Sequence, residues 1–102
     1  MPYMIETWDK PGSEALRADT RNEHLRYLDA NKHRLLACGA KLADDSELAT
    51  GGLYILDTED PAEARSFIGD DPFTRAGLFE RTEVIRWRKA FFNFERLVPP
   101  TP

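Results

Sequence analysis

A chain of 102 residues is long enough for one domain with one modest hydrophobic core. The net charge is −4 and the arginines are scattered among acidic residues, which argues against a nucleic-acid partner. The longest nearly apolar run, residues 35–40, is too short to cross a membrane, so no membrane partner is expected.

The single cysteine, Cys38, excludes a disulfide framework within the chain and fits a reducing compartment. The amino terminus lacks a basic segment followed by an apolar one, so we expect no signal peptide. Together these features lead us to expect a cytoplasmic protein.

The first half of the chain predicts a strand, a helix and two further strands. Residues 3–8 are rich in aromatic and β-favouring types, which indicates the first strand. Ser13 can cap the helix, because its hydroxyl can accept a hydrogen bond from a free amide of the first turn. We expect that helix from Glu14 to about Ala30. The next strands are expected at residues 35–42 and 52–56, separated by an acidic, glycine-containing loop.

The second half opens with an explicit helix start. Asp60 is the expected cap, Pro61 suits the first helical position, and Glu63 can reach back as in a capping box. One face of this helix is apolar at spacings of three and four: Ala64, Phe67 and Ile68. Asp71 and Pro72 then open one more turn, and the alternation in residues 84–88 predicts the last strand.

This order of elements predicts an α+β fold, namely a ferredoxin-like βαββαβ sandwich with both helices on one face of an antiparallel sheet. We expect a single domain over residues 1–98 and a disordered tail over residues 99–102. Two helices cover only one face of the sheet, while the aromatic residues imply apolar groups on both faces. A homodimer with the two sheets face to face would cover the second face.

His24 and Arg21 draw attention because the helical repeat of about 100° per residue places them with Arg17 beside Leu28, on the apolar side of the first helix. Burying a cation without a partner costs several kcal/mol, so both side chains should have partners. A backbone carbonyl could satisfy His24, or His24 could belong to a site. Asp71 is equally open: as a helix cap it needs no other role, yet a capping carboxylate keeps one oxygen free.

Several segments, in this order and spacing, resemble the YciI-like (YCII-related) family over about residues 3–88. They are Arg21-x-x-His24-Leu-x-x-Leu28, residues 52–57 followed by Asp60-Pro-Ala-Glu-Ala64, Asp71-Pro-Phe73 with Ala76-Gly-Leu78, and Val84-Ile-Arg-Trp87. The resemblance implies a dimeric α/β-barrel built on a ferredoxin-like protomer. It also implies a pocket with a histidine–aspartate pair, which falls on His24 and Asp71, and an arginine one turn earlier, which falls on Arg21. A few relatives resemble small-molecule lyases acting on chlorinated hydroxyquinols. The stretch from Ala90 to the carboxy terminus lies outside the resemblance.

A histidine oriented by a carboxylate is suited to proton transfer at neutral pH. Arg21 could hold an anionic or phenolate oxygen of a substrate. Aromatic walls would suit a flat ligand, and the candidates are Trp8, Tyr54 and Phe79. We therefore expect a small organic molecule as the ligand, and a reaction of the proton-transfer, elimination or isomerisation type. A non-catalytic ligand-binding or regulatory dimer is the main alternative, and a purely structural dimer is a second.

The remaining histidine, cysteine and aromatic residues do not indicate a further functional site. Two histidines and one cysteine without close ligand spacing disfavour a metal, and we expect no cofactor. Cys38 is expected to act as a small hydrophobic residue in a buried strand rather than as a nucleophile. The aromatic run Phe91 to Phe94 is expected to be a dimer contact or a plug in the core rather than a ligand site.

Overall fold

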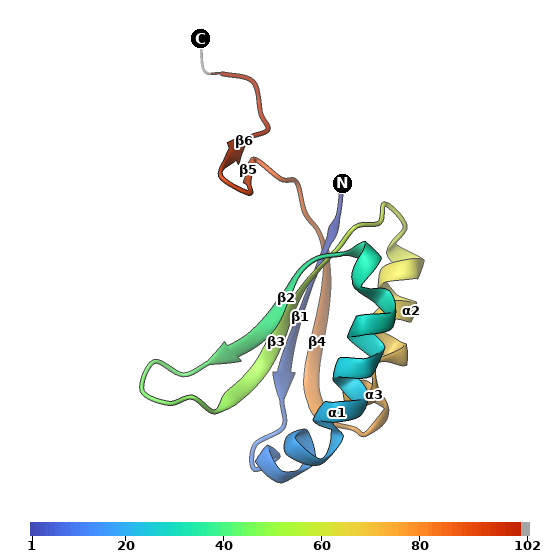
Figure 1. The fold of residues 1–102 in the computed structure, drawn as a ribbon, viewed down its shortest axis with the longest axis vertical. Helices are drawn as coiled ribbons and strands as arrows, with labels where there is room; N and C mark the ends of the chain where they lie inside the picture. The colour runs from blue at the N-terminus through green and yellow to red at the C-terminus, as the bar shows by residue number, and fades with distance from the viewer. Residues whose placement is uncertain (101–102) are drawn as a thin grey trace.

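The computed structural model describes residues 1–100 and has a mixed α+β fold, in which helices cover one face of a four-stranded antiparallel sheet (Figure 1). In chain order the elements are β1 (Tyr3–Asp9), α1 (Glu14–Asn31), the 3-10 helix η1 (Lys32–Arg34), β2 (Leu35–Leu42), β3 (Ala49–Leu56), α2 (Pro61–Asp70), α3 (Pro72–Arg75), β4 (Phe79–Arg86), and a small hairpin of β5 (Phe91–Phe92) and β6 (Glu95–Arg96). Among the described residues, no helix has the length and apolar character needed to cross a membrane.

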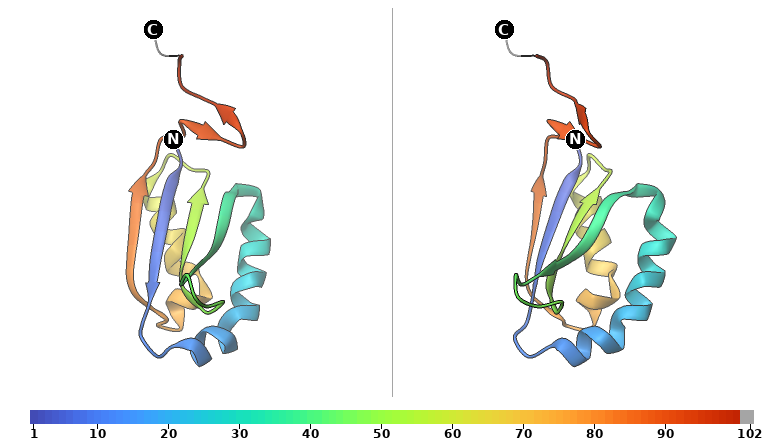
Figure 2. Two further views of the ribbon diagram at one scale, coloured as in Figure 1. Left: turned by 90° about the vertical axis from the view of Figure 1, so that its left-hand side faces the viewer. Right: turned by 60° about the vertical axis from the view of Figure 1, so that its left-hand side comes forward.

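The strands lie in the order β2-β3-β1-β4, and β1 pairs antiparallel with both neighbours. Ile5 lies opposite Tyr54 of β3 and Val84 of β4, so these side chains share one face. Tyr3, Ile5 and Thr7 are buried beneath the helices, which lie behind the sheet in the left view of Figure 2. The alternate residues of β1 point to the outer face: Met4, Glu6 and Trp8.

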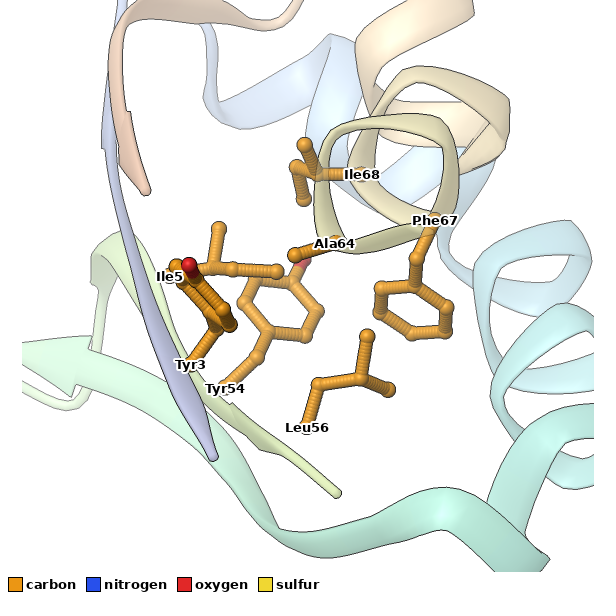
Figure 3. Close-up of a cluster of buried hydrophobic side chains, with 7 residues drawn as sticks. All are labelled: Tyr3, Ile5, Tyr54, Leu56, Ala64, Phe67 and Ile68. Atoms are coloured by element: carbon orange, nitrogen blue, oxygen red, sulfur yellow. The ribbon is translucent and has the colours of Figure 1, made fainter. Parts of the chain in front are cut away.

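The hydrophobic core lies between the sheet and α2 (Figure 3). Burial of each large apolar side chain contributes about 1.5–3 kcal/mol, so this cluster supplies much of the stability. Its members come from β1, β3 and α2: Tyr3, Ile5, Tyr54, Leu56, Ala64, Phe67 and Ile68. Helix α1 is different, because its one buried residue is His24. The core therefore lies on the α2 side, and α1 covers a part of the sheet that is mostly outside this core.

The helix starts are only partly as expected. The Asp60 side chain accepts the Ala62 amide at 2.9 Å, and Pro61 begins α2, which confirms the predicted cap. The capping box is wrong, because Glu63 instead accepts from the Thr58 hydroxyl at 2.8 Å. The cap at Ser13 is also wrong, because its side chain makes no capping hydrogen bond.

Two strands differ in extent from their predictions. β3 begins at Ala49, three residues before the expected start, and β4 covers Phe79–Arg86 rather than 84–88. Pairing with β1 explains the extension to Gly51 on one side and Phe79 on the other, and pairing of Ala49 with Leu42 of β2 explains the first residues of β3. A Cβ at Gly51 would lie 2.0 Å from the Thr7 carbonyl oxygen. This glycine, expected in a loop, permits the close approach of two strands.

The carboxy-terminal hairpin stands apart from the sheet (Figures 1 and 2). Phe91 is 63% exposed and Phe94 is 109% exposed, so the expectation of a core plug is wrong. In the expected tail, the carbonyl of Pro99 accepts a hydrogen bond from Arg96 at 2.6 Å. Residues 101–102 of that tail lie outside the described residues.

Candidate active site between α1 and the sheet

Asp71 is a fully buried carboxylate at the junction of α2 and α3. As the cap of α3 its Oδ1 accepts the Phe73 amide at 2.9 Å, and Pro72 follows at the first helical position. Its Oδ2 accepts the Tyr54 hydroxyl at 3.0 Å. The His24 Nδ1 atom lies 2.8 Å from Oδ1 and 3.0 Å from Oδ2. The capping role and a second role therefore coexist in one side chain.

His24 lies in the third turn of α1 and is 9% exposed. Its ring stacks on Phe73, with 3.9 Å between centroids and 16° between planes. The partner of the imidazole is the Asp71 carboxylate, so the alternative of a backbone carbonyl is wrong. An ionised carboxylate only accepts hydrogen bonds, so in the neutral form of the imidazole Nδ1 carries the proton and Nε2 keeps the lone pair. Within the described part of the chain, Nε2 has no hydrogen-bond partner.

Tyr54 lies on β3 beneath this pair and is 2% exposed. Burial, together with the negative charge of Asp71, raises the pKa of its phenol far above the ordinary value of 10. The phenol therefore stays protonated and donates to Asp71 throughout the physiological range. Tyr54 acts as a support for the carboxylate and also lines the cavity described below.

Two arginines lie on the same side of α1 as His24, and they differ in how firmly they are held. Arg17 donates to Asp9 at 2.7 and 3.2 Å and to the Gly51 carbonyl at 3.2 Å. Its guanidinium also lies 4.7 Å from the centroid of the Phe73 ring. Arg21 is exposed and, among residues 1–100, has no ion-pair partner within 4.0 Å, so the expectation that it is buried with a partner is wrong. Arg17 is thus a fixed part of the wall, whereas Arg21 keeps its donors available.

These residues border a cavity of about 500 Å³ between α1 and the strands β2 and β3. The lining combines polar and charged side chains, among them the two arginines and His24, with apolar ones such as Leu25 and Leu28. The lining is formed by Arg17, Arg21, His24, Leu25, Leu28, Asp29, Lys32, Leu35, Cys38, Gly39, Ala40, Gly51, Gly52, Tyr54 and Phe73. The cavity falls within the usual size of small-molecule sites.

Cys38 lines this cavity and is exposed, so its expected place in a buried strand is wrong. β2 is an edge strand, and Cys38 lines the cavity with Gly39 and Ala40, whereas Leu35 at the start of the strand packs against the core. Partial desolvation and the nearby charge of Asp71 raise the pKa of the thiol to about 11. The group is therefore a neutral thiol at pH 7.

Two of the expected aromatic walls lie elsewhere. Trp8 is on the outer face of the sheet, where Lys41 and Arg81 lie 4.0 and 4.6 Å from its ring centroid. The inward position of Thr7 forces this orientation, because successive side chains of a strand point to opposite faces. Phe79 packs edge-on against Phe73 at 6.0 Å, behind the stacked ring, and does not line the cavity.

Sequence reasoning placed Arg17 beside His24 but gave it no role, and it missed Phe73. The signal for Arg17 was its position one helical turn before Arg21. The signal for Phe73 was its place two residues after the cap, where its amide and ring both reach the pair.

In the described part of the chain, no group of three or more His, Cys, Asp or Glu side chains is arranged to hold a metal ion.

The fold and site define a small α+β domain in which a helix–sheet cavity ends on a buried carboxylate–histidine pair. Residues 1–88 match the family model of the YCII-related domain, and the chain belongs to that family. The proteins named Protein YciI from Escherichia coli and Shigella flexneri are each 32% identical over 98 residues, which cover 89% of this chain and 100% of the relative.

A solved structure is also similar. It is 5-chloro-2-hydroxyhydroquinone dehydrochlorinase (TftG) from Burkholderia phenoliruptrix, in complex with 2,5-dihydroxybenzoquinone. The two chains are 37% identical with a TM-score of 0.81, and the match covers 86% of this chain and 94% of the other.

Proposed function

We propose that this protein is an acid–base enzyme of the lyase or isomerase type, with no requirement for a metal, that acts on a small aromatic or anionic organic molecule. The observation that carries the proposal is the arrangement of His24. Its Nδ1 is held by Asp71, while Nε2 has no hydrogen-bond partner among residues 1–100 and His24 lines a cavity of about 500 Å³. An imidazole held in this way is oriented to accept a proton from a bound molecule.

Asp71 would serve as a positioning group. The buried carboxylate fixes the tautomer of His24 and stabilises the imidazolium that forms when Nε2 takes a proton. Tyr54 and the Phe73 amide occupy the remaining acceptor sites of the carboxylate, so its orientation is set before a substrate arrives. This prior ordering avoids reorganisation during the reaction.

Arg21 would bind the substrate. Its guanidinium carries donors that no described carboxylate occupies, and it lies one turn from His24 on the same helix. A carboxylate or phenolate oxygen would complete this group through charge-assisted hydrogen bonds. The similarity to a dehydrochlorinase that was solved with a dihydroxybenzoquinone supports a flat, oxygen-substituted ring as the substrate class.

The simplest reaction is an elimination. His24 Nε2 takes a proton from a hydroxyl group or an acidic carbon of the substrate. The electron pair that is released forms a new double bond and expels the leaving group as an anion. The imidazolium then returns its proton to solvent, so the net change is the loss of an acid. If no leaving group is present, return of the proton to another atom gives an isomerisation.

The assembly that we propose is a homodimer of ferredoxin-like protomers forming a dimeric α/β-barrel, located in the cytoplasm. The strand order β2-β3-β1-β4 with two helical crossovers fits such a protomer. The outer face of the sheet supports a second copy, because paired positions of the four strands form an apolar row across it. This row consists of Ala37, Ile55, Met4 and Ile85. Leu53 adds to it and is 38% exposed.

The test uses the purified full chain under anaerobic conditions, with 5-chloro-2-hydroxyhydroquinone as the probe. Chloride release and the absorbance of the quinone product are followed together. Replacing His24 by glutamine should lower kcat/KM by about 10²–10⁴-fold, the usual contribution of a positioned general base. The matched control is His33→Gln, because His33 is the other histidine of the chain and is exposed. Equal turnover by His24→Gln and the control would contradict the assignment.

The alternative is a binding or regulatory module with the same cavity, and this alternative is also favoured by Arg21, which has no ion-pair partner in the described part of the chain. Calorimetry with 2,5-dihydroxybenzoquinone separates the two. A ligand recovered unchanged after long incubation, bound with an affinity that Arg21→Gln weakens, would select the binding module. Turnover of the chlorinated probe would select the enzyme.

A further inference from the structure

The carboxy-terminal arm, residues 88–100, has no assigned role and, apart from its first residue Arg88, lies beyond the residues that match the family. Its hairpin is ordered by pairing of β5 with β6 and by a hydrogen bond from the Leu97 amide to the Ala90 carbonyl at 2.8 Å. The hairpin stands beyond the end of β4, separated from the helices and the core (Figures 1 and 2). Phe91 is 63% exposed and Leu97 is 45% exposed.

The tip of the arm holds an aromatic residue in an unfavourable conformation. Asn93 and Phe94 have φ angles of 53° and 63°, both in the left-handed region. Asparagine tolerates this region and glycine is favoured at the second position of such turns, whereas a phenylalanine is strained there. The side chain of Phe94 is nevertheless fully exposed. A strained and exposed aromatic residue at the tip of an ordered hairpin indicates a contact with another molecule.

Charge separates the arm from the rest of the protein. The arm contains three basic residues and one acidic residue, so its net charge is +2. Because the whole chain has a net charge of −4, the residues outside the arm have a net charge of −6. The basic residues are Arg88, Lys89 and Arg96. An arm of this charge is attracted to an acidic surface and would be repelled by a basic one.

The β2–β3 loop, residues 43–48, has the complementary properties. It carries three carboxylates, on Asp44, Asp45 and Glu47. Two exposed leucines lie at its two ends: Leu48, its last residue, is 60% exposed, and Leu42, the residue before it, is 49% exposed. The loop therefore offers acidic groups for the bases of the arm and apolar groups for its aromatic residues.

The arm and the loop lie at opposite ends of the same sheet, so they do not meet within one chain. The register places Tyr3, Leu56 and Arg86 side by side at the end from which the arm departs. The β2–β3 loop leaves the other end, beyond the pair Leu42 and Ala49. Figure 1 shows both features reaching out on the side of the sheet that faces away from the helices. They border the outer face of the sheet from its two ends.

We propose that the arm of each protomer docks on the β2–β3 loop of a second copy of this chain. The inference rests on the face-to-face dimer proposed above. A twofold axis that crosses the midpoint of the line joining the arm to the loop, at a right angle to that line, exchanges these two positions, so such an axis brings each arm onto the partner's loop. Both contacts of the dimer form at once, and the sheet faces lie between them.

A disulfide cross-link tests the contact. In a Cys38→Ser background, Phe94→Cys and Leu48→Cys are combined in one chain and also prepared separately. Under mild oxidation the combined variant should give a covalent dimer, and so should a mixture of the two separate variants. Each separate variant alone should stay unlinked. If light scattering shows a dimer but no cross-link forms, the docking of the arm is wrong and the proposed dimer still stands. If the protein is a monomer at every concentration, both the docking and the dimer are wrong.

Charge reversal gives an independent readout. Arg88→Glu with Lys89→Glu should raise the dissociation constant of the dimer about tenfold or more at low salt, and 1 M salt should reduce the effect. Adding Asp44→Lys with Asp45→Lys should restore dimerisation. The matched control is Arg26→Glu with Arg65→Glu, two exposed basic residues on the helices. Equal weakening by the control, or failure of the rescue, would contradict the pairing of arm and loop.

Discussion

Removing the hydroxyl of Tyr54 isolates one hydrogen bond of the site while the ring that packs in the core stays in place. The Tyr54→Phe variant loses the bond to Asp71 Oδ2 at 3.0 Å. Hydrogen bonds to charged groups contribute about 1.5–3 kcal/mol. The carboxylate keeps its bonds to His24 and the Phe73 amide, so it is not left unpaired. We therefore expect the free energy of unfolding to fall by about 2 kcal/mol.

For a domain of this size, about 2 kcal/mol corresponds to a decrease in Tm of about 8–16 °C. Urea unfolding should show a lower midpoint with an unchanged m value. Tyr3→Phe is the matched control, because Tyr3 is also buried and its hydroxyl has no hydrogen-bond partner among the described residues. The control should change the unfolding free energy by less than about 0.5 kcal/mol. If Tyr54→Phe costs no more than the control, the carboxylate does not depend on this donor and the reasoning fails.

Three further predictions concern the strands, the thiol and a surface carboxylate. Gly51→Ala should destabilise the protein by about 3 kcal/mol in urea unfolding, because its Cβ would collide with the β1 backbone. The control is Gly39→Ala, where the new Cβ has nothing within 4 Å, and its unfolding free energy should change by less than about 0.5 kcal/mol. Cys38 should react slowly with iodoacetamide at pH 7.5, and the rate should rise up to about pH 11, since only the thiolate reacts; a rate that levels off near pH 8.5 would contradict the raised pKa. The Thr58 hydroxyl lowers the pKa of Glu63 below 4.5, so Thr58→Val should move this pKa upward in an NMR titration. The lowered pKa of Glu63 stabilises the wild type above pH 4.5, and this stabilisation disappears as the pH falls. Thr58→Val should therefore be less stable than the wild type above pH 4.5, and an unchanged titration of Glu63 would refute the role of the Thr58 hydroxyl.

The contact of His24 with Asp71 could be predicted because each residue sits at a position fixed by local rules. A helical count places the histidine on the inner side of α1, and the sequence Asp-Pro places the aspartate at a helix cap. The family resemblance supplied the information that the two elements meet. Arg17 was harder, because its partners Asp9 and Gly51 belong to strands whose approach depends on the whole sheet.

Trp8 shows a different limit. The strand β1 alternates, but the sequence offers an aromatic residue on each face, so composition did not identify which face was inward. The structure places the hydroxyl of Thr7 inside and the indole of Trp8 outside, between two cations. Gly51 was equally ambiguous, because a pair of glycines is typical of a loop and also of strands that approach closely.

The separation of the core from the cavity has a consequence for how such proteins diversify. The apolar cluster lies under α2, whereas the cavity wall on α1 is held by polar contacts such as those of Arg17 and by the bond from the Tyr27 hydroxyl to the Phe67 carbonyl at 2.7 Å. Exchanges at the exposed positions of that wall, such as Arg21 and Leu25, can reshape specificity during evolution with little penalty to folding, whereas Leu28 also packs against the core. Tyr54 belongs to both regions, so selection on stability and selection on chemistry meet at that residue.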